Sequence, residues 1–115
     1  MTFYEIRHVS SAADAASDPN FQTVCDYLRV DQGDDDTMVW KCICSAYDYI
    51  LAAVGEVDED DATVTLLLCA ITQDLYDHRE LTQSEQQLKL RQGQTYQTII
   101  LQLQMKHSLS EEESS

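Results

Sequence analysis

Apolar residues recur at helical spacing through residues 39–54, and no other feature of the chain restricts its fold so strongly. One stripe, with i, i+3, i+4 and i+7 spacing, consists of Val39, Cys42, Ile43, Ala46, Ile50, Ala53 and Val54. A second stripe beside it consists of Trp40, Cys44, Tyr47 and Leu51. A helix that is apolar over so much of its girth is buried on two sides. We therefore expect it to lie in a core or at a contact between subunits.

The same spacing predicts a helix before and a helix after this segment. The earlier helix starts near Pro19, with Asp18 as its cap, and ends near Val30. Its apolar residues are Phe21, Val24, Cys25 and Leu28. The later helix starts near Asp61 and turns polar at residues 76–80. Its inner face consists of Val64, Leu67, Leu68, Ile71 and Leu75.

A last helix is predicted around residues 96–103, where Tyr96, Ile99, Ile100 and Leu103 keep helical spacing. The alternation in "ILQLQM" leaves a strand there as the less favoured alternative. The glutamine-rich residues 81–94 predict a mobile polar loop. Residues 106–115 predict a disordered acidic tail.

Turn-forming residues are scarce, with 3 glycines and 1 proline among 115 residues, which favours long helices over a β-rich fold. We predict an all-α fold, a small bundle of four to five helices. Residues 1–19 would form an N-terminal arm or short helix, and residues 20–105 the helical domain. This length suits one domain.

Acidic residues dominate the charge, which is −14, and many of them lie in short runs. This charge disfavours general binding to nucleic acid or to anionic membranes, and no apolar stretch is long enough to span a membrane. The run from Asp31 to Asp36 does not match an EF-hand, because the glycine comes third and the twelfth residue is Cys42. We predict instead that Asp34 to Asp36 and Asp58 to Asp61 cap helix N-termini, with a weak cation site as the minority alternative.

Catalytic and metal-binding motifs are not found in the sequence. Cys42 and Cys44 are two residues apart, so on a helix they point to nearly opposite sides and cannot chelate one metal ion. The first twenty residues lack a secretory signal, so the four cysteines are expected to be free cytosolic thiols. His78 beside Asp77 is interpreted as a solvated helix end rather than a catalytic pair. We predict no enzyme, no cofactor, no metal and no catalytic residue.

Several segments in order resemble the small head–tail connector proteins of tailed bacteriophages, a family linked with DNA packaging and head completion. The segments are "VCDYLRVD" at 24–31, an acidic turn, "SAYDYILAAVG" at 45–55, and "LLLCAITQDLYDHREL" at 66–81. "IILQLQ" at 99–104 is similar to the final helix of some members. The resemblance covers residues 21–105, and it rests on order and spacing more than on any one motif.

This resemblance implies a structural virion protein. It would form a homo-oligomeric ring of about a dozen copies between the portal protein and the tail or head-closure protein, and it would be found at the head–tail junction of the virion, or in the host cytoplasm during assembly. DNA would pass through without specific binding, since an acidic wall repels it. The candidate residues for subunit or partner interfaces are Trp40, Tyr47, Leu51, Tyr76 and Arg79.

Two other functions, a DNA mimic and an enzyme, rank below the connector. An acidic mimic of DNA that inhibits a host nucleic-acid-binding protein is the alternative, and it rests on the net charge of −14 alone. A mimic should display its acids along whole exposed faces, whereas here many are gathered at predicted helix starts and in the tail. An enzyme ranks third, for want of a nucleophile, metal or phosphate motif.

Overall fold

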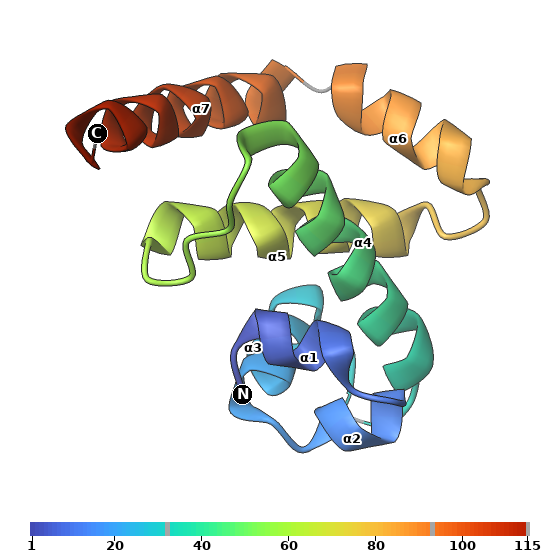
Figure 1. The fold of residues 1–115 in the computed structure, drawn as a ribbon. Helices are drawn as coiled ribbons and strands as arrows, with labels where there is room; N and C mark the ends of the chain where they lie inside the picture. Colours follow the sequence, from blue (N-terminus) through green and yellow to red (C-terminus); the bar gives the residue numbers. More distant parts are fainter. Residues whose placement is uncertain (32, 93, 115) are drawn as a thin grey trace.

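The computed structural model describes residues 1–31, 33–92 and 94–114, with side chains described except at 83, 87, 90–95 and 110–114. Seven helices and no strand occur in these ranges, so the predicted all-α class is confirmed (Figure 1). The helices are α1 (Phe3–His8), α2 (Ala12–Ala16), α3 (Pro19–Leu28), α4 (Asp36–Val54), α5 (Ala62–Asp77), α6 (Gln83–Gln92) and α7 (Gln94–Ser114).

Helix α4 is the central element, and it packs most extensively against α5. It starts and ends where the sequence predicts. Gly55 follows its last residue with φ of 100°, a left-handed conformation that glycine adopts without strain, and its N–H donates to Leu51 O over 2.9 Å. Ile43 and Ile50 of α4 are fully buried, as are Leu68 and Ile71 of α5 (0–1 % exposed). These two helices form the middle of the core.

Aspartates cap α3 and α5, as predicted. Asp18 accepts a hydrogen bond from Asn20 N at 2.9 Å, and Asp61 accepts one from Thr63 N at 2.9 Å. Each bond satisfies an amide that the helix itself leaves without a partner. Helix α3 packs on α5, and its buried residues are Phe21, Val24 and Cys25.

The N-terminal residues form two short helices, α1 and α2, that both pack on α4. Phe3, Ile6 and Ala15 belong to the same core cluster as α4 and α5. Helix α1 therefore covers Trp40 and Tyr47 of the second apolar stripe of α4, while Leu51 of that stripe remains exposed.

Two predictions for the C-terminal half are wrong. Helix α6 covers Gln83–Gln92, where a mobile loop was expected, and α7 continues to Ser114, within the segment that was expected to be a disordered tail. Helix α6 starts with a side-chain cap, in which Thr82 Oγ1 accepts from Glu85 N at 3.2 Å and donates to Glu85 Oε1 at 2.9 Å. With these additional segments and the two N-terminal helices, the described ranges hold more helices than the four to five expected.

Candidate functional site

The end of α5 and the start of α4 are joined by a polar cluster that contains two of the predicted interface residues. Tyr76 donates its phenol O–H to Asp35 Oδ2 at 2.7 Å. The guanidinium of Arg79 lies 4.5 Å from the centre of the Tyr76 ring, and its Nη1 donates to Tyr76 O at 2.7 Å. The hydrogen bond to Asp35 and partial burial raise the pKa of Tyr76. The cluster thus holds the neutral phenol of Tyr76 between the carboxylate of Asp35 and the guanidinium of Arg79.

An open pocket of about 120 Å³ lies beside this cluster, between α4, the end of α5 and α6. It is lined by Met38, Lys41, Cys42, Ser45, Leu75, Arg79, Leu81 and Gln86. Two of the chain's 7 basic residues line it, and none of the described carboxylates does. The charges suit contact with an anionic group. Lys41 was not predicted as a site residue, although a lysine on a helix of a strongly acidic chain was a signal available in the sequence.

In the second run of acids, residues 58–61, three carboxylates accept hydrogen bonds from the chain itself. Glu59 accepts hydrogen bonds from Phe3 N at 2.5 Å and from Tyr4 N at 3.2 Å, so it caps α1. Asp58 Oδ1 accepts from Asp60 N at 3.1 Å. In the first run, Asp36 accepts from Gly33 N at 3.0 Å, while Asp35, expected to cap α4, makes no side-chain cap bond and binds Tyr76 instead.

Metal binding finds no support in the described residues, where no group of three or more His, Cys, Asp or Glu side chains could hold an ion. The minority cation-site alternative therefore gains nothing from the structure.

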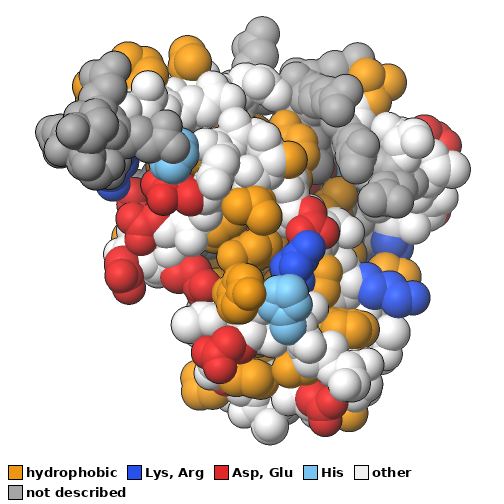
Figure 2. All heavy atoms as spheres, viewed as in Figure 1, with side chains coloured by type: hydrophobic (Ala, Val, Ile, Leu, Met, Phe, Trp, Pro, Cys, Tyr) orange, Lys and Arg blue, Asp and Glu red, His pale blue; other side chains and the backbone are white. Residues whose placement is uncertain are grey.

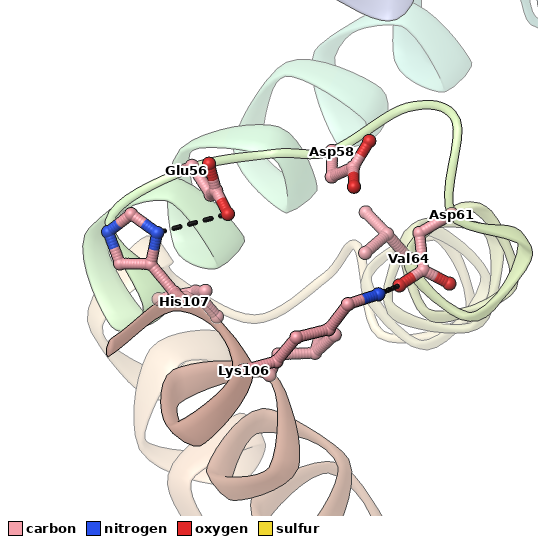
Figure 3. A pocket seen from close by; sticks show the side chains of 8 residues that line it. Glu56, Asp58, Asp61, Val64, Lys106 and His107 are labelled. Carbon is pink, nitrogen blue, oxygen red and sulfur yellow. Dashed lines mark hydrogen bonds and ion pairs between the residues drawn. The ribbon is translucent and has the colours of Figure 1, made fainter. Parts of the chain in front are cut away.

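A second pocket lies where α7 crosses the loop between α4 and α5. Figure 3 shows His107 and Lys106 of α7 reaching to Glu56 and Asp61 on either side of it. His107 Nδ1 is 3.0 Å from Glu56 Oε1, and Lys106 Nζ is 2.8 Å from Asp61 Oδ2. The bond from Lys106 lowers the pKa of Asp61, which also caps α5. These contacts attach α7 to the body and explain why its helix continues past residue 105. The sequence analysis missed both residues because it assigned them to a tail.

The other predicted interface residues differ in their exposure. Trp40 Nε1 donates to Ile6 O at 2.9 Å, and Tyr47 is 6 % exposed with Arg7 lying 5.8 Å from its ring centre. Both residues hold α1 on α4. Leu51 is 40 % exposed and remains accessible. Figure 2 shows hydrophobic side chains gathered near the middle of this face, with acidic, basic and histidine side chains around them.

His78 contacts groups of its own chain through both ring nitrogens. Nδ1 lies 2.9 Å from Asp74 O and 3.1 Å from Asp74 Oδ1, and Nε2 lies 2.8 Å from Lys89 Nζ. Asp74, one turn earlier in α5, is therefore the acid that pairs with His78, rather than the adjacent Asp77.

The four cysteines are free, and Cys25, Cys42 and Cys69 are buried while Cys44 is half-buried. Burial raises the pKa of the Cys25 and Cys42 thiols to about 11. Burial also raises the pKa of Cys44 and of Cys69. Thiols with raised pKa values are poor nucleophiles at neutral pH.

Comparison of the chain with models of known protein families, with curated proteins and with solved structures gave no match. Within the described residues, no helix combines the length and the apolar character needed to cross a membrane.

Proposed function

We propose that this chain is a structural protein of a tailed bacteriophage, which forms a ring between the portal and the tail and continues the DNA channel. The observation that carries the proposal is the order of segments that resemble the connector family. Residues 24–31, 45–55 and 66–81 lie on or directly beside α3, α4 and α5, which form one core. The bond from Tyr76 to Asp35 links the acidic turn to the "LYDHRE" segment, two of the elements that carry the resemblance.

The charge of the chain fits passage of DNA without retention. A wall formed by a protein of net charge −14 repels phosphates, so DNA would slide along it. The open pocket with Lys41 and Arg79 is a local exception, and an acidic segment of a neighbouring virion protein is the kind of partner that it would suit.

The alternative of a DNA mimic receives less support. A mimic needs acids free to meet the basic surface of its target. Asp35, Asp36, Glu59 and Asp61 instead accept hydrogen bonds from the chain itself, and Asp48 pairs with Arg7 at 2.6 Å.

The test is binding to the portal protein of the phage that encodes this chain. We expect the purified protein to co-sediment with portal rings and to add a ring of density in negative-stain images. Leu51→Asp should weaken binding, whereas Ala52→Asp, which adds the same charge on the adjacent exposed residue of α4, should not. Failure of the wild-type protein to bind the portal, with specific capture of a host nuclease or repressor, would reject the connector in favour of the mimic.

A further inference from the structure

Helix α7 presents a row of exposed large apolar side chains on the side away from the body. Leu101, Met105 and Leu109 are 57 %, 60 % and 59 % exposed, and they are spaced four residues apart. The opposite side of α7 is buried, since Ile100 and Leu103 are 4 % and 7 % exposed. Residues at i, i+4 and i+8 form one ridge along a helix. We call Leu101, Met105 and Leu109 the α7 ridge.

The α7 ridge lies in a part of the chain that has no acidic residue. No Asp or Glu occurs between Glu85 and Glu111, although the chain has 21 acids among its 115 residues. The cation closest to the ridge, Lys106, is paired with Asp61 at 2.8 Å. The ridge is therefore an apolar strip that is free of acids up to residue 110, and Glu111 to Glu113 follow directly after it.

We propose that the α7 ridge binds the α7 ridge of a second copy of this chain, with the two helices antiparallel about a two-fold axis at Met105. The row is symmetric about its middle residue, so this axis brings each Met105 to its equivalent and Leu101 to Leu109 of the other copy. Contact of a patch with itself is the usual arrangement of a symmetric dimer. Ridges with four-residue spacing interdigitate when the helices cross at about −50°.

Electrostatics favours a second copy at this strip over other partners. Two copies of charge −14 repel each other, and they can approach only where neither presents acids. A strongly basic partner would bind the acidic surfaces instead of a strip without acids. Each copy contributes three side chains, so the contact is small. The dimer should therefore be weak, in the class of transient associations. The inference concerns the free protein and does not depend on the proposed ring.

The first test is sedimentation velocity over a concentration series at low and high salt. We expect the mass to rise from 13.1 kDa toward twice that value with concentration. Association should strengthen in about 1 M NaCl, because salt screens the repulsion between the copies and leaves apolar contact intact. Met105→Gln should weaken association by about tenfold or more, since the central contact of an interface carries most of its energy. Leu66→Gln is the matched control, because Leu66 is also 60 % exposed but lies on α5.

The second test places a thiol on the proposed axis. Under a mild oxidant, Met105→Cys should form a disulfide-linked dimer, because the two equivalent residues lie within the 4–7 Å between Cα atoms that such a bond needs. The wild type and Leu66→Cys, treated in the same way, should remain monomeric on a non-reducing gel. Retention of the wild-type thermal transition in Met105→Gln and Met105→Cys shows that both variants fold.

Three outcomes would overturn the inference. They are a monomer at every concentration and salt level, association that weakens with salt, and a Leu66 variant that loses association while the Met105 variant keeps it. A large closed ring that persists in Met105→Gln would overturn the two-fold contact and leave the proposed function intact. Portal binding by a protein that never dimerises would likewise overturn the two-fold contact and leave the proposed function intact.

Discussion

Tyr76 and Asp35 are 41 residues apart in sequence, yet the phenol of Tyr76 donates to the carboxylate of Asp35 across 2.7 Å. This bond joins the C-terminal turn of α5 to the residue that precedes α4. Both residues are partly buried, so the bond is less screened than an exposed one. It is the polar connection between the two central helices at this end of the core.

We expect Tyr76→Phe to lower the free energy of unfolding by about 1–2 kcal/mol, the usual contribution of a hydrogen bond to a charged partner. Urea denaturation followed by circular dichroism measures the change. Tyr27→Phe is the control, because Tyr27 is 38 % exposed and its hydroxyl makes no hydrogen bond among the described residues. In a double-mutant cycle, Asp35→Asn should add little to Tyr76→Phe, and full additivity would show that the bond contributes nothing.

The stability from this bond should also depend on pH. Because Asp35 raises the pKa of Tyr76 in the folded state, the contribution is fully present below the unfolded value of about 10 and declines as the pH passes above it. The difference in unfolding free energy between the wild type and Tyr76→Phe should therefore be constant from pH 7 to 9 and shrink above pH 10. A difference that grows in this range would contradict the assignment.

Glu59 is predicted to keep α1 on the body, since its carboxylate accepts from Phe3 N and Tyr4 N. Glu59→Gln should speed hydrogen exchange of the amides of α1 and lower stability by about 1 kcal/mol, the usual cost of a lost cap. Asp60→Asn removes a neighbouring exposed charge whose carboxylate caps nothing in the structure, and it should leave exchange in α1 unchanged. Equal effects of the two substitutions would indicate a general charge effect instead of a cap.

The sequence predicted α3, α4 and α5 well because their signals are local. Asp18 before Pro19, Asp61 before a helical apolar run, and Gly55 after one each mark a boundary within a few residues. Helix α6 lacks such an apolar pattern, and its composition looked like a loop. The Thr-x-x-Glu pattern of Thr82 and Glu85 was the signal that could have identified it.

The site contacts depend on long-range packing, so local patterns could not reveal them. Glu59 and Phe3 are 56 residues apart, and Lys106 and Asp61 are 45 apart. The helix that contains Trp40 and Tyr47 was predicted to be buried on two sides, and Tyr47 is buried while Leu51 is exposed. Which partner covers it, α1 or another subunit, follows only from the arrangement of the helices.

Cysteine reactivity should follow burial. In the native protein at pH 8, iodoacetamide should modify Cys44 first, while Cys25, Cys42 and Cys69 should react only after unfolding in urea. Peptide mass spectrometry of samples taken over time measures this order. Rapid modification of Cys42 in the native state would show that its thiol is reached through the open pocket that it lines.

Burial of the same thiols should destabilise the protein at high pH. Cys25 and Cys42 have folded pKa values of about 11, against 9.0 for an ordinary thiol. The unfolded chain therefore loses thiol protons at a lower pH than the folded chain, and the stability present below pH 9 declines between pH 9 and 11. The decline should be smaller in Cys42→Ala than in the wild type, when unfolding free energies at pH 8 and 10.5 are compared.

Gly55 should tolerate substitution less well than Gly33. Both have a positive φ, of 100° and 95°, so alanine at either position costs about 1 kcal/mol of backbone strain. A Cβ at Gly55 would also lie 3.1 Å from Nε2 of His107, whereas a Cβ at Gly33 meets no atom within 4 Å. We therefore expect Gly55→Ala to lower the melting temperature more than Gly33→Ala, and to loosen α7 as measured by hydrogen exchange.

The background of His107→Ala separates the two causes at Gly55. Removing the imidazole relieves the contact but leaves the backbone strain, so Gly55→Ala should then cost about as much as Gly33→Ala. This background also lacks the ion pair with Glu56, so each glycine variant must be compared with His107→Ala itself. If Gly55→Ala remains the more costly substitution there by the same margin, the imidazole is not the obstacle, and the position of α7 over this loop would have to be revised.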